Sequence, residues 1–405
     1  MVNDMDYNSI LSSRVQAIEP SATIAMSQKS AELRAAGVDV INLSVGEPDF
    51  YTPDHIKAAA KAAIDANFSF YTPVAGYRDL QEAVVNKLAR ENGLQYAPEQ
   101  IIIGNGAKHE LSNVLAALVN AGDEVVIPTP AWVSYVQLVK LYGGVPVTVN
   151  AGIEQGFKVT PQQLDDAITP RTRLIILCSP SNPSGAVYSR DELAALAVVI
   201  ERHEQVMILS DEIYEHINYV GRHASLAEFA ELKERVALIN GVSKAYAMTG
   251  WRIGYVAAPL WLAKAVNKLQ SQQTSNVSSI AQKAAVAALD GPQECVEEMR
   301  RAFERRRNLL IGLLRDIPGL DVEVPDGAFY AFPRVTALLG RRTPDGEDLN
   351  DDMALALYLL REAHVATVGG SAFCCPGYLR LSYATSDDNL IEAASRIAAA
   401  IEKLQ

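Results

Sequence analysis

Seven short apolar runs, mostly separated by segments of helical period, constrain the fold of this chain more than any other feature. The runs are Ile101–Ile103, Val125–Ile127, Pro146–Val149, Leu174–Cys178, Val206–Leu209, Val236–Ile239 and Gly254–Ala258. Helical patterns fall between them, for example at residues 110–120, 131–142 and 191–203. This alternation predicts an α/β fold, in which a mostly parallel seven-stranded sheet is flanked by helices on both faces.

The pattern changes near residue 290, which suggests a second domain. A long charged helix predicted over 293–316 precedes Val322–Phe332, a β-like region punctuated by Pro and Gly. Another helix, the strand-like Leu379–Tyr383 and an Ala-rich terminal helix follow. We expect a large domain over residues 51–290 and a smaller α+β domain over residues 291–405, with residues 1–50 packing against the smaller one.

Composition argues against several classes of protein. The net charge is −12, from 36 Lys and Arg against 48 Asp and Glu, which opposes binding to nucleic acid. No apolar run approaches membrane-spanning length, and Met1–Tyr7 lacks the basic start of a signal peptide, so we expect a cytoplasmic protein without a membrane partner. The four cysteines and six histidines show no metal-ligand spacing, and we interpret adjacent Cys374 and Cys375 as packing residues rather than a redox pair.

Polar or glycine-containing segments directly follow four of the predicted strands. These segments are Gly104–Lys108, Ser179–Pro183, Ser210–Glu212 and Gly241–Lys244. In open parallel sheets, ligands bind beyond the carboxyl ends of the strands. The shared position therefore predicts that these four segments form one site.

Lys244 is the candidate nucleophile of that site. It follows the apolar run Val236–Ile239 and lies between small residues. Burial there would lower the pKa of its amine, which could then form a Schiff base with a carbonyl group. Ser243 and Arg252 add a hydroxyl and a guanidinium suited to a phosphate. An amine beside phosphate-binding groups predicts pyridoxal phosphate as the cofactor.

Three further polar residues suit a pyridine cofactor, although each has an ordinary alternative. Asp211 ends a predicted strand and can keep a ring nitrogen protonated, or it can cap the next helix. Tyr214, three residues on, can donate to a phenolic oxygen or pack in the core. Asn182 lies between Pro180 and Pro183, where it can bind cofactor and substrate or form a simple turn.

Other candidates surround the expected cofactor. Gly104–His109 leads into a helix whose first N–H groups can approach a phosphate. Lys108 either faces an acidic substrate or is solvated at the helix start, and Trp132 either stacks on an aromatic ring or packs in the core. Arg380 lies between apolar residues and needs an anion, which can be a substrate carboxylate or an internal Asp or Glu.

With these motifs in order along the chain, the sequence resembles the class I aminotransferases, which are fold-type I pyridoxal-phosphate enzymes. The resemblance runs from about residue 14 to the carboxyl end and covers Ser44–Phe50, Tyr71–Tyr77, Ser179–Gly185, Ser210–Tyr214 and Ser243–Arg252. Within the family, the chain is most similar to the bacterial aspartate aminotransferase subgroup, some of whose members also use prephenate.

The resemblance implies a role for each candidate around the cofactor. Lys244 would carry the internal aldimine, and Asp211 would pair with the pyridine nitrogen. Asn182 and Tyr214 would contact the 3-oxygen, while Trp132 would stack on the ring. The groups around the phosphate would be Gly106, Ala107, Lys108, Ser243 and Arg252. Tyr71 would reach that phosphate from a neighbouring subunit, which makes a homodimer part of the active site.

The resemblance also implies how a substrate would bind. Arg380, Asn182 and the backbone of Gly46 would hold the α-carboxylate, and Lys108 would bind the distal carboxylate of a dicarboxylic substrate. The implied reaction is ping-pong transamination between an L-amino acid, aspartate or glutamate, and a 2-oxo acid, 2-oxoglutarate or oxaloacetate. The alternatives are another amino donor (aromatic, prephenate/arogenate or specialised) and a lyase or decarboxylase on the same scaffold.

One segment departs from the family pattern. Where many relatives have Pro-Gly before the substrate arginine, this chain has Val-Gly-Gly-Ser-Ala-Phe over Val368–Phe373, followed by Cys374, Cys375 and Pro376. We expect this segment to reshape the small-domain side of the substrate pocket.

Overall fold

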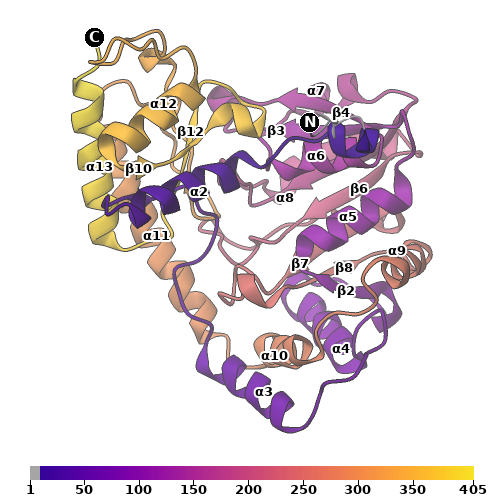
Figure 1. Cartoon of the computed structure of the whole chain (residues 1–405). Helices are drawn as coiled ribbons and strands as arrows, with labels where there is room; N and C mark the ends of the chain where they lie inside the picture. The colour runs from indigo at the N-terminus through magenta and orange to yellow at the C-terminus, as the bar shows by residue number, and fades with distance from the viewer. Residues whose placement is uncertain (1–9) are drawn as a thin grey trace, which may run out of the picture.

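A seven-stranded sheet forms the centre of the larger part of the molecule (Figure 1). This computed structural model describes residues 10–405, and residues 1–9, on which the signal-peptide prediction rests, lie outside the described residues. The strands are β2 (Ile101–Asn105), β3 (Glu124–Thr129), β4 (Val145–Asn150), β5 (Thr172–Cys178), β6 (Met207–Asp211), β7 (Val236–Gly241) and β8 (Ile253–Ala257). Their order is β2-β8-β7-β6-β5-β3-β4, and β8 alone runs against the others. The seven predicted strands and the mostly parallel sheet are confirmed.

Helices cover both faces of this sheet, which explains why its strands are apolar at consecutive positions. On β2, Ile101 and Ile103 belong to one core cluster, whereas Ile102 belongs to the cluster on the opposite face. The first face packs against α3 (Asp54–Asp65), α4 (Arg78–Lys87), α7 (Pro161–Ala167), α8 (Arg190–Glu201) and α10 (Ser279–Asp290). The second packs against α5 (Ala107–Leu118), α6 (Ser134–Leu141) and α9 (Leu260–Gln273). Because side chains alternate along a strand, both faces need apolar residues.

The smaller part of the molecule contains the long helix α11 (Glu294–Arg315), which runs up into it from the larger part in Figure 1. Its other helices are α12 (Asp352–Tyr358) and α13 (Asp387–Glu402), and its sheet has the order β11 (Val368–Gly369), β12 (Leu379–Ser382), β9 (Tyr330–Ala331). The four cysteines are free, and burial raises the pKa of Cys375 to about 12, as expected for a packing residue rather than a redox group.

The amino-terminal residues from α2 (Ala22–Ala35) onward pack with this smaller part, whereas Glu19 lies against the larger part, where its N–H donates to Oε1 of Gln137 in α6 at 2.9 Å. Strand β1 (Ile41–Asn42) pairs in parallel with β10 (Val365–Ala366), and Met26 from α2 joins the same core cluster as residues of α11 and α13. The exact division of the chain at residues 50 and 290 stays a prediction. Among residues 10–405, no helix has the length and hydropathy needed to cross a bilayer.

Two expected elements differ in the structure because their backbone groups bond elsewhere. The helix expected over 131–142 begins at Ser134, since the N–H of Ala131 donates to the carbonyl of Phe373 at 3.0 Å. The region 322–332 is a strand only at its end, Tyr330–Ala331. Before that point, Gly327 and Ala328 donate to the carbonyls of Gly185 and Ile217 instead of a neighbouring strand.

Candidate active site

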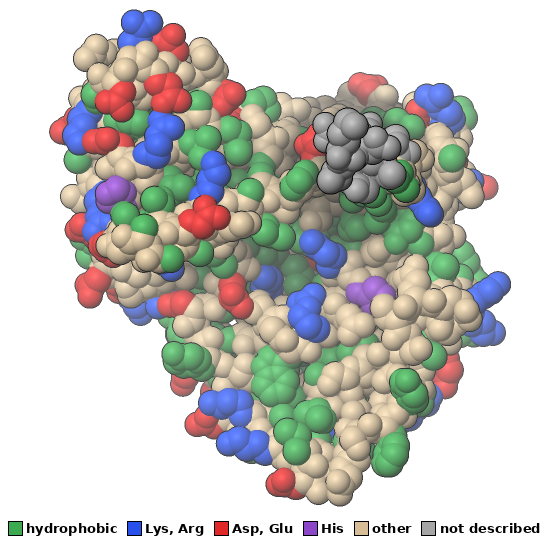
Figure 2. Space-filling model, viewed as in Figure 1, with side chains coloured by type: hydrophobic (Ala, Val, Ile, Leu, Met, Phe, Trp, Pro, Cys, Tyr) green, Lys and Arg blue, Asp and Glu red, His purple; other side chains and the backbone are tan. Residues whose placement is uncertain are grey.

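A cavity of about 330 Å³ opens at the carboxyl edge of the large sheet, where the smaller part of the molecule meets it. Figure 2 shows a hollow on this face of the molecule, with Lys and Arg side chains gathered along it. The predicted site residues that line the cavity are Gly46, Ala107, Lys108, Trp132, Asn182, Asp211, Tyr214, Ser243, Lys244, Arg252 and Arg380. The segments predicted to follow the strands therefore meet in one place.

Two predicted site residues are not part of this wall. Gly106 precedes α5 with a φ of +83°, and a side chain there would collide with the guanidinium of Arg252. The absence of a side chain lets the arginine lie against the start of the helix. Tyr71 lies outside the cavity and is 93% exposed in this single chain.

Lys244 is half-buried at the floor of the cavity, just after β7. Its Nζ donates a hydrogen bond of 2.6 Å to the carbonyl oxygen of Gly46. Burial lowers the pKa of this amine to about 8, because the charged form loses its hydration, although the Glu47 carboxylate partly opposes the shift. The amine is thus available as a nucleophile close to neutral pH, as the sequence predicted.

Asp211 lies at the end of β6 and is held by two donors. Tyr135 donates its hydroxyl to Oδ2 at 2.6 Å, and the N–H of Ile213 donates to Oδ1 at 3.2 Å. Burial raises the pKa of Asp211 to about 6, while these two hydrogen bonds act in the opposite direction. A cationic ring nitrogen nearby would favour the ionised carboxylate. Tyr135 was missed from the sequence, where it resembles any apolar residue of helix α6.

Arg380 is almost fully buried, yet no carboxylate in residues 10–405 forms an ion pair with it. Its Nη1 donates to Oδ1 of Asn182 at 2.9 Å, and its Nη2 donates to the carbonyl of Ser44 at 2.5 Å. Its Nε has no partner in the described chain. The internal ion pair considered from the sequence is therefore absent from the described residues, and the guanidinium remains available to an external anion.

Lys108 supplies a second cation. Its Nζ lies 4.7 Å from the centre of the Trp132 ring, and it forms no ion pair within the described residues 10–405. Burial lowers its pKa, and the nearby guanidinium of Arg252 adds to this effect. The cavity is therefore lined by Lys108 and Arg380, two cations without carboxylate partners.

The start of α5 and the side chain of Arg252 form a site suited to a dianion. Ala107 is the first residue of α5, and the first N–H groups of a helix have no partner within the helix. Arg252 donates to the carbonyl oxygens of Thr249 at 2.8 Å and Asn105 at 3.2 Å, which fixes its guanidinium beside this helix end. Ser243 adds a hydroxyl to the same cavity.

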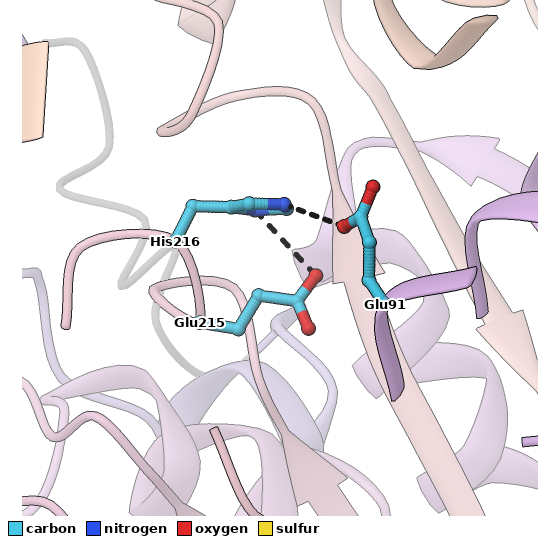
Figure 3. A group of neighbouring side chains, drawn as sticks. All are labelled: Glu91, Glu215 and His216. Atoms are coloured by element: carbon cyan, nitrogen blue, oxygen red, sulfur yellow. Dashed lines mark hydrogen bonds and ion pairs between the residues drawn. The ribbon is translucent and has the colours of Figure 1, made fainter. Parts of the chain in front are cut away.

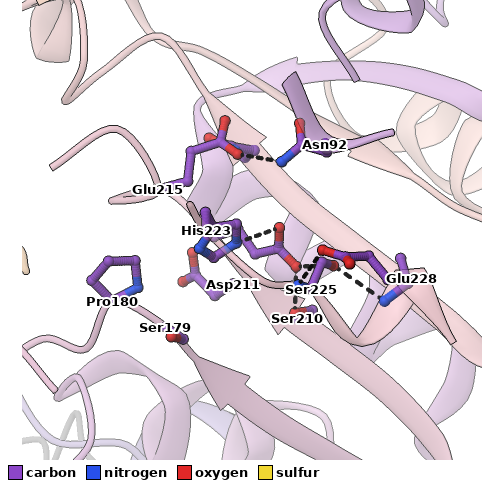
Figure 4. A network of polar contacts seen from close by, with 12 residues as sticks. Asn92, Ser179, Pro180, Ser210, Asp211, Glu215, His223, Ser225 and Glu228 are labelled. Atoms are coloured by element: carbon purple, nitrogen blue, oxygen red, sulfur yellow. Dashed lines mark hydrogen bonds and ion pairs between the residues drawn. The ribbon is translucent and has the colours of Figure 1, made fainter. Parts of the chain in front are cut away.

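A buried polar network surrounds Glu212, the residue that follows Asp211 (Figure 4). The Glu212 carboxylate accepts hydrogen bonds from Ser210 at 2.8 Å and Ser225 at 2.5 Å, and it lies 2.9 Å from Nε2 of His223. Burial lowers the pKa of His223, but Glu212 and Glu215 outweigh this effect and raise it overall. This network could not be predicted from the sequence, because its members are ordinary polar residues until the fold brings them together.

The network continues to a second group of charges, in which Lys87 is the central cation. Lys87 is 1% exposed and pairs with the buried carboxylate of Glu215, which also accepts a hydrogen bond of 2.8 Å from Asn92. In Figure 3, His216 lies between Glu91 and Glu215, at 2.9 Å and 3.5 Å. Burial raises the pKa of Glu215, but Lys87 and the two nearby histidines outweigh it and hold the pKa well below its usual range.

Removing Lys87 alone should destabilise the protein strongly. Lys87→Met would leave the buried carboxylate of Glu215 without its cation, and we expect the free energy of unfolding to fall by about 3–5 kcal/mol. The double variant Lys87→Met/Glu215→Gln should recover part of this loss, since no unpaired buried charge remains. Urea unfolding of the three proteins measures both effects, and a loss below 1 kcal/mol in the single variant would contradict the assignment.

The groups around the cavity fit pyridoxal phosphate. A dianion site lies at the start of α5, a buried carboxylate lies at Asp211, and an amine of lowered pKa lies at Lys244. These three groups suit a phosphate, a protonated ring nitrogen and a carbonyl carbon, all of which that cofactor contains.

Residues 38–397 match the sequence model of the family described as aminotransferase class I and II. The chain belongs to this family. It is a pyridoxal-phosphate-dependent aminotransferase of fold type I, and it catalyses transamination.

This aminotransferase is similar over nearly its whole length to curated relatives and to the solved structure of a related enzyme. It is 51% identical to an aspartate/prephenate aminotransferase of Cereibacter sphaeroides over 391 residues, which is 96% of this chain and 98% of that protein. It is also 51% identical to an aspartate aminotransferase of Geobacillus stearothermophilus, over 96% of this chain and 98% of that one. The crystal structure of aspartate aminotransferase from Rhizobium meliloti superposes with a TM-score of 0.94 at 46% identity, covering 98% of this chain and 99% of that chain.

Proposed function

We propose that this aminotransferase exchanges an amino group between L-aspartate or L-glutamate and the 2-oxo acids 2-oxoglutarate or oxaloacetate. The observation that carries the proposal is the pair of cations in one cavity. Arg380 and Lys108 both lack carboxylate partners within residues 10–405, so a dicarboxylic substrate can neutralise both at once. The names of the relatives, aspartate and aspartate/prephenate aminotransferase, support the same choice.

Each cofactor-side residue then has a defined task. When bound, pyridoxal phosphate supplies an electron sink for the charge left on the substrate α-carbon. Lys244 holds the carbonyl carbon of the cofactor and, once substrate has taken its place, its Nζ removes the proton from the substrate α-carbon. Asp211 keeps the proton on the ring nitrogen, and Tyr135 orients that carboxylate. The residues that would hold the phosphate are Gly106, Ala107 and Lys108, through their backbone, and Ser243 and Arg252, through their side chains.

The remaining residues position the ring and the substrate. Trp132 stacks on the ring, and its face also carries the Lys108 ammonium at 4.7 Å. Tyr214, whose hydroxyl lies 2.8 Å from that of Tyr330, contacts the 3-oxygen together with Asn182. Asn182 also holds Arg380 at 2.9 Å, which orients the guanidinium toward the substrate α-carboxylate beside the backbone of Gly46.

We also propose a homodimer in which Tyr71 reaches the phosphate of the neighbouring subunit. Tyr71 is 93% exposed, and the large aromatic residues Phe70 and Tyr51 are 81% and 92% exposed. Exposed apolar groups of this size are typical of a protein interface. Sedimentation of the purified protein should give the dimer mass, and a monomer with full activity would contradict the proposal. The cytoplasmic location stays a prediction from the sequence.

The test of the donor is a set of half-reactions. The purified enzyme is mixed with single amino acids, and the absorbance of the bound cofactor is followed. Aspartate and glutamate should react fastest, and Lys108→Leu should lower their kcat/KM by about 10²-fold while leaving alanine nearly unchanged. Failure of both acidic donors, with success of a neutral or basic one, would overturn the Lys108 assignment.

The second half-reaction, with a 2-oxo acid as acceptor, distinguishes transamination from lyase or decarboxylase activity. With 2-oxoglutarate, oxaloacetate and prephenate as separate acceptors, a transaminase forms one new amino acid for each donor consumed. Loss of the donor without that product would indicate a lyase or a decarboxylase.

Cofactor uptake should depend on pH through Lys244. Because burial lowers the pKa of its amine to about 8, the neutral, nucleophilic form accumulates as the pH rises through that value. Apoprotein mixed with pyridoxal phosphate should therefore bind it covalently at a rate that rises with pH and has its midpoint near 8. Borohydride trapping measures the rate, and Lys244→Ala is the blank. A midpoint at the 10.5 of an ordinary lysine would show that the amine is not desolvated.

A further inference from the structure

The segment that departs from the family pattern connects two walls of the active site. Gly370–Gly377, called here the 370–377 loop, joins β11 to β12, and these strands pair so that Val368 lies opposite Arg380. Within the loop, Phe373 is fully buried, and its ring centre lies 4.9 Å from the guanidinium of Arg380. The carbonyl of Phe373 also accepts the N–H of Ala131, the residue before Trp132. A shift of this loop would therefore move both Arg380 and the segment that contains Trp132.

One buried carboxylate anchors both ends of the loop. Asp352, the first residue of α12, is 0% exposed. Its Oδ2 accepts the N–H of Gly377 at 2.6 Å and the hydroxyl of Ser371 at 3.0 Å, and its Oδ1 accepts the N–H of Ser371 at 3.1 Å. No cation pairs with Asp352 within the described residues 10–405. The loop itself therefore provides the hydrogen bonds that offset the burial of this charge.

The glycine at position 369 makes this anchor possible. A Cβ on Gly369 would lie 2.5 Å from Oδ1 of Asp352 and 2.6 Å from Sδ of Met353. Distances this short require a neighbour to move, and the neighbour is the carboxylate that holds the loop. Gly369 and the buried Asp352 are therefore two parts of one arrangement.

The ring of Phe373 links the loop held by Asp352 to the guanidinium of Arg380. The Phe373 ring lies 6.0 Å from that of Phe332, edge to face, and both belong to a small buried cluster with Val368, Cys375 and Tyr378. Arg380 lies between the rings of Phe373 and Tyr330, at 4.9 Å and 4.6 Å. Aromatic faces on a guanidinium restrict its plane, which sets the direction of its N–H groups.

We propose that Asp352 is a positioning residue for substrate binding, which holds the 370–377 loop so that Phe373 fixes the guanidinium plane of Arg380. It touches neither substrate nor cofactor. The inference rests on the proposed role of Arg380 in binding the α-carboxylate. Because that carboxylate is common to every amino donor, the inference does not depend on aspartate being the donor.

The test separates KM from kcat in the holoenzyme. Asp352→Ala should raise KM about tenfold for whichever donor is active in the half-reactions, while kcat changes less than threefold and the cofactor dissociation constant is unchanged. Asp352→Asn, which keeps one acceptor oxygen, should give a smaller rise in KM. Phe373→Leu should reproduce the rise while leaving the carboxylate in place.

Asp351 provides the matched control on the same helix. This exposed carboxylate caps α12 by accepting the N–H of Ala354 at 2.7 Å, and within the described residues 10–405 it forms no hydrogen bond or ion pair with the loop. Asp351→Ala should lower the melting temperature without changing KM.

The proposal is overturned if KM is unchanged in folded Asp352→Asn and Asp352→Ala, or if Asp351→Ala raises it equally. If Arg380→Leu leaves KM unchanged, the role of Arg380 fails instead, and the two failures are distinguishable.

Discussion

Replacement of Lys244 by alanine is expected to lower turnover by at least about 10⁴-fold, the upper range for loss of a positioned general base. In the structure, Lys244 provides the amine at the cavity floor, and its Nζ is fixed by the carbonyl of Gly46 at 2.6 Å. The same nitrogen is proposed to hold the cofactor and to move the α-proton, so one substitution removes both tasks. Single-turnover conversion of the amino donor, with the variant saturated with pyridoxal phosphate, measures the loss.

Two variants control for the charge and for the cavity. Lys244→Arg keeps a cation at the position but provides no neutral amine, so it should be as inactive as the alanine variant. Lys108→Leu removes a cation from the same cavity but should retain turnover of a neutral donor. Normal turnover by Lys244→Ala would exclude this residue as the catalytic base.

The second largest effect is expected from Arg380→Leu, which should lower kcat/KM by about 10³-fold, or about 4 kcal/mol. The guanidinium is 1% exposed and has no carboxylate partner in residues 10–405, which is why we propose that the substrate α-carboxylate neutralises it. Arg380→Lys keeps the charge but not the planar pair of donors, so its kcat/KM should lie between those of the wild type and of Arg380→Leu. Steady-state kinetics with unchanged cofactor affinity would assign the loss to substrate binding. An unchanged kcat/KM in folded Arg380→Leu would refute the role.

The strands and the cofactor side of the site could be predicted because their signals are local in sequence. A parallel strand buried on both faces is a continuous apolar run, and the residues after it lie at the binding edge by geometry alone. Lys244, Asp211 and Asn182 all follow such runs, and the structure places all three in one cavity. Their meeting in one site could therefore be predicted from the sequence, while their roles toward the cofactor stay a prediction.

Contacts between distant segments could not be predicted in the same way. Tyr135 lies 76 positions from the Asp211 carboxylate that it holds, and Arg380 lies 336 positions from the Ser44 carbonyl that it meets. Tyr135 has no distinguishing neighbours in the sequence, and Ser44 contributes only its backbone. The start of α6 and the irregular backbone before Tyr330 likewise depend on hydrogen bonds from remote segments, which outweigh local helix or strand preference.

The pairing of β1 with β10, together with the hydrogen bond between Arg380 and Ser44, has a consequence for biosynthesis. A chain emerges from the ribosome with its amino terminus first, so Ser44 leaves the tunnel long before its partner Arg380 is synthesised. The strands of the large sheet, by contrast, end at Ala257, and the helices α9 and α10 that cover its faces end by Asp290. We therefore expect the nascent polypeptide to form the side of the cavity that contains Lys244 and Asp211 early. Strand β1 stays without its partner β10 until translation is almost complete. The Arg380 side of the cavity is therefore completed after the Lys244 side.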